Sequence, residues 1–383
     1  MGVADGYRTR AEGLVENPFN GLLAFIGLYL VADLILKLNG VDVVVNVPGM
    51  GATKIVGGVE PLHSFVNKVI NGILRGLIIG LAGVGLSMTY SILSFANFAH
   101  GDYLSVGAFS GWCASYVVAL FTLGLSNPLE EIFLLNAPSV VSIAAAPAAV
   151  IVGLVVSAAA TVAIVLAIDR VVYKPMRDRG GIALLIASIG VALALRYTIV
   201  FIWSTELRSI TSVEELPSYS IPVVDGVYTI NLHEITMVVA AVALMLGVHV
   251  ILQFTKLGKA MRAMADNKDL AQVTGIPTER IVRATWIIGG GLAGMAGFLI
   301  MLNRGNLSWN FGWRLLLFVF SGVILGGIGS VYGAIGGGIL IGIASRMALI
   351  WIPSGFARVA AFSVMILVLL YRPSGLFGGV TTA

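Results

Sequence analysis

Residues 141–168 read V-S-I-A-A-A-P-A-A-V-I-V-G-L-V-V-S-A-A-A-T-V-A-I-V-L-A-I, a run without one charged side chain. A helix of about 20 residues, rising about 1.5 Å per residue, crosses a bilayer core of about 30 Å. The whole chain shares this character: 58% of its 383 residues are hydrophobic and only 11% are charged. Globular domains carry about 25% charged residues. This composition argues against soluble enzymes, nucleic-acid binders and disordered scaffolds, and it predicts a polytopic membrane protein.

Further apolar runs predict the remaining helices. After a polar tail at residues 1–18, a first span contains Asp33 and Lys37. A long apolar stretch at 315–371 is interrupted twice, by glycines near 326–329 and by a proline at 353. The predicted spans are 19–38, 69–93, 103–123, 141–168, 182–203, 235–254, 284–302, a half-helix 315–327, 331–350 and 356–371.

These runs predict an all-α bundle of about 9–10 transmembrane helices in a multi-pass protein of the cell membrane. Broken or re-entrant segments are expected near 94–102 and 315–331, and residues 19–378 are expected to form a single transmembrane domain. Glycines four residues apart allow two helix backbones to approach closely in lipid. Such pairs are Gly76/Gly80, Gly290/Gly294, Gly322/Gly326, Gly333/Gly337 and Gly338/Gly342.

The distribution of basic residues among the loops predicts the orientation. Segment 169–181 holds four Lys or Arg residues, and segment 253–283 holds six. Loops 122–140 and 204–234 together hold one arginine and seven acidic residues. Cytoplasmic loops are enriched in Lys and Arg, so the first two segments are predicted to be cytoplasmic and the other two external. Arg346 then falls near the outer face, against this pattern.

The stretch S-F-A-N-F-A-H-G-D, residues 94–102, separates two predicted spans. It places Asn97, His100 and Asp102 at the membrane, and two interpretations stay open. Asn97 and Asp102 can cap the two helix ends, where the Asp102 charge suits the dipole of a first turn. Alternatively, these side chains line a translocation path, because ionisable groups at membrane depth are costly and are usually functional or paired.

Arginines also occur inside predicted spans. Arg75 lies near the outer end of its span, so its side chain is expected to extend to the membrane surface. Arg196 lies deeper, in A-L-A-L-R-Y-T, and is expected to face the bundle interior or a polar partner. We therefore group Arg196 with Asn97, His100 and Asp102 as candidates for the translocation path.

The predicted cytoplasmic loop 256–283 contains a clear amphipathic feature. Apolar residues recur there at helical spacing on a charged background. Gly275 follows where a helix-terminating glycine belongs, with Pro277 just beyond, and Thr278 can cap a second short helix. Such an elbow can dock into a groove on a soluble partner; the alternative is a helix lying on the membrane surface. The apolar stripe comprises Leu257, Ala260, Met261, Met264, Ala265 and Ala271.

Metal binding and catalysis are not indicated. The single cysteine, Cys113, excludes an intrachain disulfide and a cysteine metal cluster. The four histidines are too far apart in the sequence for a zinc site. The sequence also has no His/Asp/Ser or His/Glu group with a spacing typical of a catalytic site, which argues against a membrane-embedded enzyme. We therefore expect no metal, no cofactor and no catalytic residue.

Three motifs stand in order along residues 67–378. The first is N-F-A-H-G-D (97–102), and the second is R-A-M-A-D-N-K-D-L-A-Q-V-T-G-I-P-T-E-R-I (262–281). The third joins V-I-L-G-G-I-G-S-V-Y-G-A-I-G-G-G (323–338) to the ending Y-R-P-S-G-L-F-G (371–378). Together they resemble the permease subunits of branched-chain amino-acid ABC importers and their urea- and amide-importing relatives. Residues 1–66 and loop 204–234 look like additions to that family's usual plan.

The resemblance implies a transport subunit, not an enzyme, that pairs with a second homologous permease subunit. It also implies two cytoplasmic ATP-binding subunits and an extracytoplasmic substrate-binding protein, besides the lipid bilayer and without nucleic acid. The sequence lacks the nucleotide motif G-x-x-x-x-G-K-[ST], which agrees with a separate ATPase. In such a permease domain the loop 256–283 is the coupling loop, with four candidate contacts to the ATPase: Arg262, Asp266, Gly275 and Glu279.

The leading functional hypothesis is uptake of branched-chain, hydrophobic amino acids. Two alternatives stay open, a permease for urea or short amides and a stand-alone ion-coupled carrier or channel. A carrier would be expected to hold a buried acidic residue in mid-span, and only Asp33 approaches this position.

Overall fold

A computed structural model describes residues 18–47, 51–124, 141–211, 216–223 and 226–377. The chain divides into two compact units. Unit 1 comprises Met1–Asn67 and Pro222–Tyr228, and unit 2 comprises Lys68–Ile221 and Thr229–Ala383. The predicted polar tail 1–18 lies outside the described residues except for Pro18. The prediction that residues 19–378 form one domain stays a prediction.

Unit 1 contains the first predicted span and a β-hairpin. Helix α2 (Pro18–Leu38) is followed by the antiparallel strands β1 (Asp42–Val47) and β2 (Gly51–Gly57). The two charges that interrupt the span are neutralised within the unit. Asp33 is buried, its carboxylate lies 2.7 Å from the Lys37 ammonium, and it accepts a 2.6 Å hydrogen bond from the Gly57 amide.

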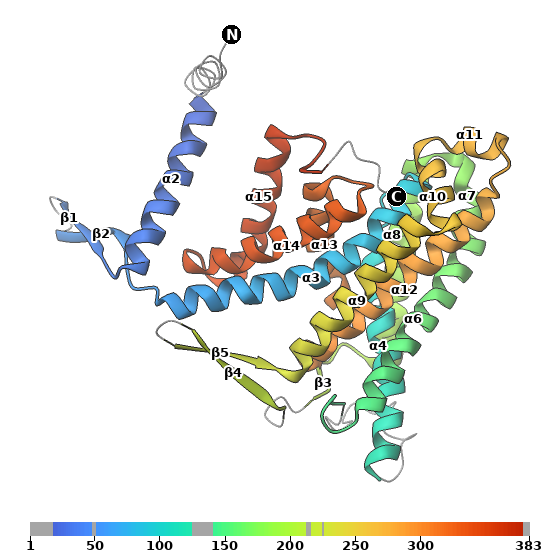
Figure 1. Ribbon diagram of the computed structural model, residues 1–383, viewed down its shortest axis with the longest axis horizontal. Coiled ribbons are helices and arrows are strands. Elements are labelled where there is room, and N and C mark those ends of the chain that lie inside the picture. Colours follow the sequence, from blue (N-terminus) through green and yellow to red (C-terminus); the bar gives the residue numbers. More distant parts are fainter. Residues whose placement is uncertain (1–17, 48–50, 125–140, 212–215, 224–225, 378–383) are drawn as a thin grey trace. The chain divides into compact units, whose positions relative to one another are not determined.

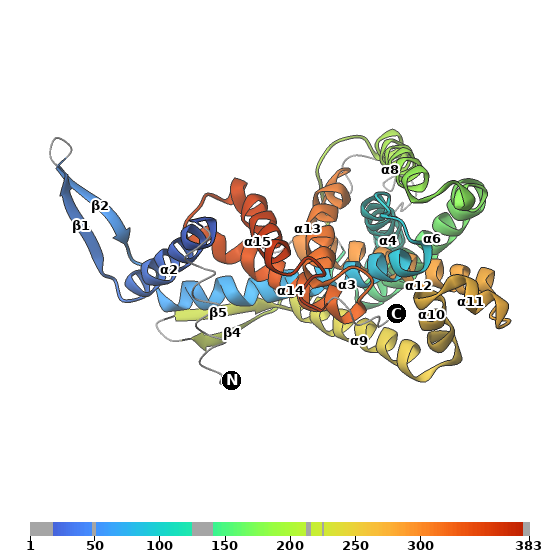
Figure 2. The same ribbon diagram turned by 90° about the horizontal axis from the view of Figure 1, so that it is seen from above.

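The remaining helices confirm an all-α polytopic membrane protein. Figures 1 and 2 show these helices in their chain order and from two directions. Within the described ranges, nine helical segments, α2 of unit 1 among them, are long and apolar enough to cross a membrane. Helix α13 is a tenth, shorter apolar helix. The helices are α3 (Leu62–Leu93), α4 (His100–Leu123), α6 (Pro147–Ile168), α8 (Gly181–Trp203), α9 (Leu232–Phe254), α12 (Thr278–Arg304), α13 (Phe311–Gly326), α14 (Val331–Met347) and α15 (Ala357–Tyr371).

Several helix starts differ from the prediction; α3, for example, begins at Leu62 and not at residue 69. Helix α6 begins at Pro147, six residues after the predicted start of its span, because the backbone of Val141 instead donates to the Ile210 carbonyl at 3.1 Å. The predicted second short helix after Thr278 is wrong. Helix α12 runs without a break from Thr278 to Arg304, since no proline or strained residue interrupts its turns.

Short β-structure occupies much of loop 204–234 and was not predicted. Strand β3 (Arg208–Ser209) pairs antiparallel with β6 (Asn306–Leu307). Strands β4 (Ser218–Val223) and β5 (Gly226–Asn231) form a separate two-stranded sheet. The β3–β6 pair fixes part of loop 204–234 to the C-terminal end of α12 within unit 2.

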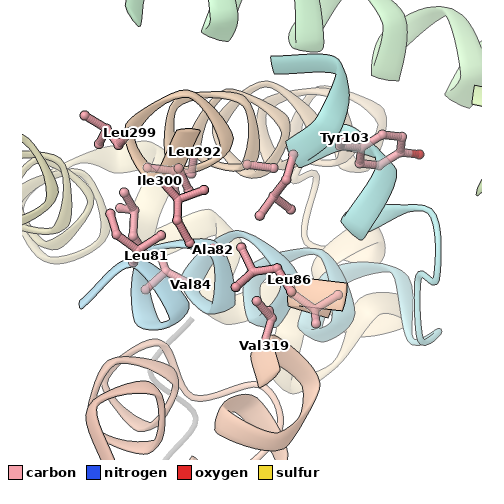
Figure 3. Packing of buried hydrophobic residues seen from close by; sticks show 14 of the residues in the cluster. Leu81, Ala82, Val84, Leu86, Tyr103, Leu292, Leu299, Ile300 and Val319 are labelled. Carbon is pink, nitrogen blue, oxygen red and sulfur yellow. The ribbon is translucent and has the colours of Figure 1, made fainter. Parts of the chain in front are cut away.

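The core of unit 2 lies where α3, α4, α12 and α13 meet. Leu81 and Leu86 of α3, Leu292 of α12 and Val319 of α13 belong to one buried cluster (Figure 3). Helices α4, α6 and α12 also pack against one another. Because lipid offers little hydrophobic drive between helices, such packing depends on close backbone approach.

Glycines provide that approach, as their spacing predicts. A Cβ atom placed on Gly338 of α14 would lie 2.5 Å from the Gly80 nitrogen of α3, and one on Gly342 would lie 2.5 Å from the Gly76 Cα atom. These neighbours are backbone atoms, which cannot move aside to make room for a Cβ atom as the end of a flexible side chain can. The predicted pairs Gly76/Gly80 and Gly338/Gly342 therefore form the crossing of α3 and α14.

We predict that Gly338→Val destabilises the protein. Overpacking a tight contact typically costs about 1–3 kcal/mol, so heating in detergent should deplete monodisperse protein at a lower temperature than for the wild type. Gly190→Val is the matched control, since a Cβ atom at Gly190 meets nothing within 4 Å. Equal heat resistance of the two variants would contradict the assigned role of the crossing.

Candidate functional site

The break between α3 and α4 is a short, tightly bonded turn of backbone. Ser94 adopts a left-handed conformation with φ of 57°, so the helix cannot continue through it. The fully buried Asn97 accepts a 3.0 Å hydrogen bond from the Ala99 amide through Oδ1. The Phe98 amide donates to Ser188 Oγ of α8 at 3.0 Å. Asn97 thus closes the turn before α4, whose N-cap residue is Ala99 and has no side-chain capping bond.

His100 fixes the first turn of α4 against α3. Its Nε2 lies 2.9 Å from the Ala82 carbonyl oxygen, which can only accept, so this nitrogen carries the proton. The side chain is 1% exposed. A Cβ atom on Gly85 would lie 3.3 Å from the imidazole, so the glycine gives the ring its room. This geometry supports a packing role for His100.

Asp102 and Arg196 form a buried ion pair between α4 and α8. Arg196 Nε donates to Asp102 Oδ1 at 3.1 Å, and its Nη2 donates to Oδ2 at 2.8 Å. The Asp102 side chain is 0% exposed and that of Arg196 is 11% exposed. The guanidinium carbon also lies 4.8 Å from the ring centre of Trp313 on α13. The polar partner that the sequence predicted for Arg196 is therefore Asp102.

A cluster of aromatic side chains that the sequence does not predict lies beside the break. The helix that contains α6 continues through a π-helical turn, Asp169–Tyr173, which buries Tyr173. The Tyr173 hydroxyl donates to Asn97 Oδ1 at 3.4 Å and lies 3.2 Å from the Tyr103 hydroxyl. Its ring stacks on Trp286 with 5.4 Å between ring centres. A lone tyrosine between Arg170 and Lys174 carries no periodic signal of burial.

The predicted coupling loop forms two helices at the opposite end of unit 2 from the β3–β6 pair. They are α10 (Lys256–Asp266) and α11 (Lys268–Val273). Met261, Met264 and Ala271 are buried, and the other members of the predicted apolar stripe pack partly buried against the core. The stripe thus covers the protein itself, which disfavours a helix lying on a membrane surface.

The four coupling candidates do not form one cluster. Asp266 is exposed. Gly275 is exposed with φ of 85°, and a Cβ atom there would meet nothing within 4 Å. Arg262 donates from Nη1 to the Leu252 carbonyl at the end of α9, which ties α10 to that helix. Glu279, at the start of α12, belongs to an ion-pair network.

That network joins α12 to the segment after α6. Arg177 donates to Glu279 at 2.7 Å from Nη1 and to both Asp169 oxygens at 2.7 Å from Nη2. Lys174 lies 3.1 Å from the other Glu279 oxygen. Arg177 and Asp169 are largely buried, whereas Glu279 is 58% exposed. Sequence reasoning identified Glu279 but not its partners, which lie about 100 residues away in the chain.

We predict that Arg196→Leu strongly destabilises the fold and that Asp102→Leu/Arg196→Leu is much less harmful. Removing one partner of a buried pair leaves an uncompensated charge, which typically costs about 3–5 kcal/mol, whereas apolar replacement of both partners is often nearly neutral. Heat resistance in detergent measures both variants, and Arg179→Leu on an exposed side chain is the control. A double variant as unstable as the single one would contradict this ion-pair account.

The similar proteins of known name are all permeases for branched-chain amino acids. BraD of Pseudomonas aeruginosa, a high-affinity branched-chain amino acid transport system permease protein, is 29% identical over 83% of this chain and 97% of its own length. LivH of Escherichia coli K12, with the same description, is 28% identical over 83% of this chain and 97% of its own. A probable LivH of Methanocaldococcus jannaschii is 28% identical over 78% of this chain and 88% of its own.

A solved structure of PsaBC from Streptococcus pneumoniae in complex with Fab has 14% identity and a TM-score of 0.41, covering 82% of this chain and 97% of that one; we draw nothing from it. The family model of the branched-chain amino acid transport system permease component matches residues 68–371. That match takes in the break at 94–99, the π-helical turn Asp169–Tyr173 and the coupling loop with α10, α11 and the start of α12. This chain belongs to the branched-chain amino acid transport system permease component family.

Proposed function

We propose that this chain is the permease subunit of an ABC importer for branched-chain amino acids. In this proposal it pairs with a second homologous permease subunit, two cytoplasmic ATP-binding subunits drive it, and an extracytoplasmic binding protein delivers substrate. Family membership and the names of the relatives, which all refer to branched-chain amino acids, support this substrate class over urea or short amides.

The observation that carries the coupling role is an apolar surface on α11. Leu270 is 61% exposed and Val273 is 85% exposed, although the opposite face of the same helix buries Ala271. We call Leu270 and Val273, together with the exposed Gly275, the coupling tip. A helix with one face fixed on its own protein and apolar side chains on the other is suited to a groove on a soluble partner. The ATP-binding subunit is the partner that we propose.

The surroundings of the coupling tip can transmit a movement to the membrane helices. An open cavity of about 590 Å³ lies beside it, with α8, α11 and α12 all contributing to its wall. Arg262 joins α10 to the end of α9, and the Glu279 network joins α12 to the α6 segment. Displacement of α11 would therefore shift three spans together. Binding of ATP between the partner subunits then favours one arrangement of the bundle, and hydrolysis restores the other.

The translocation path stays a proposal, and we place it beside the break at 94–99. The Asp102–Arg196 pair supports this placement, because a charge pair inside a membrane bundle is rare outside functional regions. If Asp102→Leu/Arg196→Leu folds but loses uptake, the pair takes part in transport. Normal uptake by that variant would leave the pair a structural role alone.

We predict that Val273→Asp removes stimulation of the ATPase by the permease. Burying an unpaired carboxylate in an apolar contact should weaken the association by at least about tenfold, which corresponds to about 1.4 kcal/mol. The measurement is ATP hydrolysis and leucine uptake in proteoliposomes that hold the complete importer with its binding protein. The wild type should take up leucine only with ATP and the ATPase, so uptake without the ATPase would overturn the proposed function.

Leu207→Asp is the matched control for the coupling tip. Leu207 is a similarly exposed apolar residue, 67% exposed, near the other end of unit 2. This variant should stimulate the ATPase as the wild type does. If Val273→Asp also leaves stimulation unchanged, the coupling tip is not the contact with the ATPase.

A further inference from the structure

Five arginines converge at one end of unit 2. They come from five helices, and the last residue of α12 is one of them. This is the end at which the Ile210 amide of loop 204–234 donates to the Gly305 carbonyl at 2.9 Å, opposite α10 and α11. The five are Arg75, Arg304, Arg314, Arg346 and Arg358.

Four of these arginines share one cavity of about 200 Å³. Besides Arg75, Arg304, Arg314 and Arg358, its wall contains the Ser354 hydroxyl and three apolar side chains: Leu315, Phe318 and Ala357. The Arg75 guanidinium carbon lies 4.7 Å from the ring centre of Phe318, which fixes it over an aromatic face. No acidic residue of the described chain is among the residues lining this cavity.

A smaller adjoining cavity, of about 80 Å³, shares Arg75 and Arg304 and adds Arg346. The acidic residue on its wall is Glu234, which also caps α9, because its Oε2 accepts from the Asn231 amide at 3.0 Å. The two cavities together therefore have five positive charges and one negative charge on their walls.

The arginines of this cluster lack the carboxylate partners that Arg177 and Arg196 have. Arg75 and Arg346 are partly buried, whereas the other three are exposed. Arg177 and Arg196 each form a close pair with a carboxylate. In contrast, no carboxylate of the described residues lies within 4.0 Å of any of the five guanidinium groups. The Nε atoms of Arg75 and Arg346 are buried without a hydrogen-bond partner in the described structure, as is that of Arg177, so the missing carboxylates are what sets the cluster apart.

The buried Nε donors of Arg75 and Arg346 are costly unless a ligand satisfies them. A buried polar group without a hydrogen bond is destabilising, and neighbouring like charges add repulsion. The guanidinium group has a planar fork of donors that binds a carboxylate through two parallel hydrogen bonds. The apolar side chains on the same wall match a short aliphatic group beside that carboxylate.

We propose that this cavity, the arginine cavity, binds the carboxylate of the transported amino acid as it reaches the permease. The proposal rests on the proposed function for the identity of the solute, and on the predicted orientation, which places this end outside the cell. Glu234 in the adjoining cavity offers a carboxylate for the ammonium group of a zwitterion. The concentration of positive charge also raises the local concentration of carboxylate solutes over cationic ones.

The direct test uses the purified full chain in phosphatidylcholine nanodiscs, without ATPase or binding protein. Phenylglyoxal modifies accessible arginines, and mass spectrometry of peptides gives the rate at each position. Leucine and isovalerate, which both carry a carboxylate, should slow modification of Arg304, Arg314 and Arg358 several-fold. Leucinamide, which lacks the carboxylate, should not, and the exposed Arg283 at the opposite end should react equally in every case.

Three outcomes of this labelling test would overturn the proposal. The first is equal protection by leucine and leucinamide, and the second is no protection by leucine or isovalerate. The third is protection by phosphatidylglycerol in the nanodisc with no further effect of leucine, which would assign the arginine cavity to an anionic lipid headgroup. Because the test needs no ATPase, protection by leucine would stand even if the proposed coupling to an ATPase failed.

In the complete importer, Arg314→Gln/Arg358→Gln should raise the KM for leucine uptake several-fold, while loaded binding protein still stimulates ATP hydrolysis. Both side chains are exposed, so the variant should fold, and Arg372→Gln is the matched control at another exposed site. The KM of Arg314→Lys/Arg358→Lys should lie between the KM of the wild type and that of the glutamine variant, because lysine keeps the charge but lacks the planar fork of donors. Loss of ATPase stimulation together with uptake would instead identify a docking surface for the binding protein and overturn the proposal.

Discussion

Lipid provides no hydrogen-bond partners, so the polar groups that this chain carries at membrane depth have to be satisfied by the protein itself. The break at residues 94–99 shows how this is done. Asn97 Oδ1 accepts from the Ala99 amide, Ser188 of α8 accepts from the Phe98 amide, and Nε2 of His100 donates to a carbonyl of α3. Among the polar atoms of the Asn97 side chain, only Nδ2 has no partner in the described structure. Each of these bonds crosses or closes the break, so the polar motif holds α3, α4 and α8 in register while it interrupts the helix.

The same constraint separates the arginines of unit 2 into two classes. Arg177 and Arg196 each pair with a carboxylate of another helix, Glu279 and Asp102 respectively, and these pairs fix helices to one another. The four arginines of the arginine cavity and Arg346 of the adjoining cavity have no such partners among the described residues, although maintaining five like charges together costs free energy. An arrangement that is unfavourable for the empty protein is favourable for an anionic ligand, which is why we assign binding to the second class and structure to the first.

Much of the fold could be predicted because span length and glycine spacing are local properties of the sequence. The apolar runs placed all ten helices, and the Gly76/Gly80 and Gly338/Gly342 pairs indicated a crossing that α3 and α14 form. The partners of charged groups could not be predicted. Asp102 and Arg196 stand 94 residues apart, and no periodicity links them. The burial of Tyr173 could not be predicted either, because it depends on a π-helical turn, which has no sequence signature.

The misplaced start of α12 has the largest consequence for function. The sequence suggested a short cytoplasmic helix followed by a separate span, whereas the structure has one helix of 27 residues from Thr278 to Arg304. At 1.5 Å per residue such a helix is about 40 Å long. Its first turn carries Glu279, in the network beside the coupling tip, and its last residue lines the arginine cavity. Most of α12 is buried among α4, α6 and α9, so it moves as part of the bundle and not alone. A displacement at the end where we propose that the ATPase docks therefore has a continuous, rigid connection to the end at which we propose that substrate binds, and no separate signalling element is needed between them.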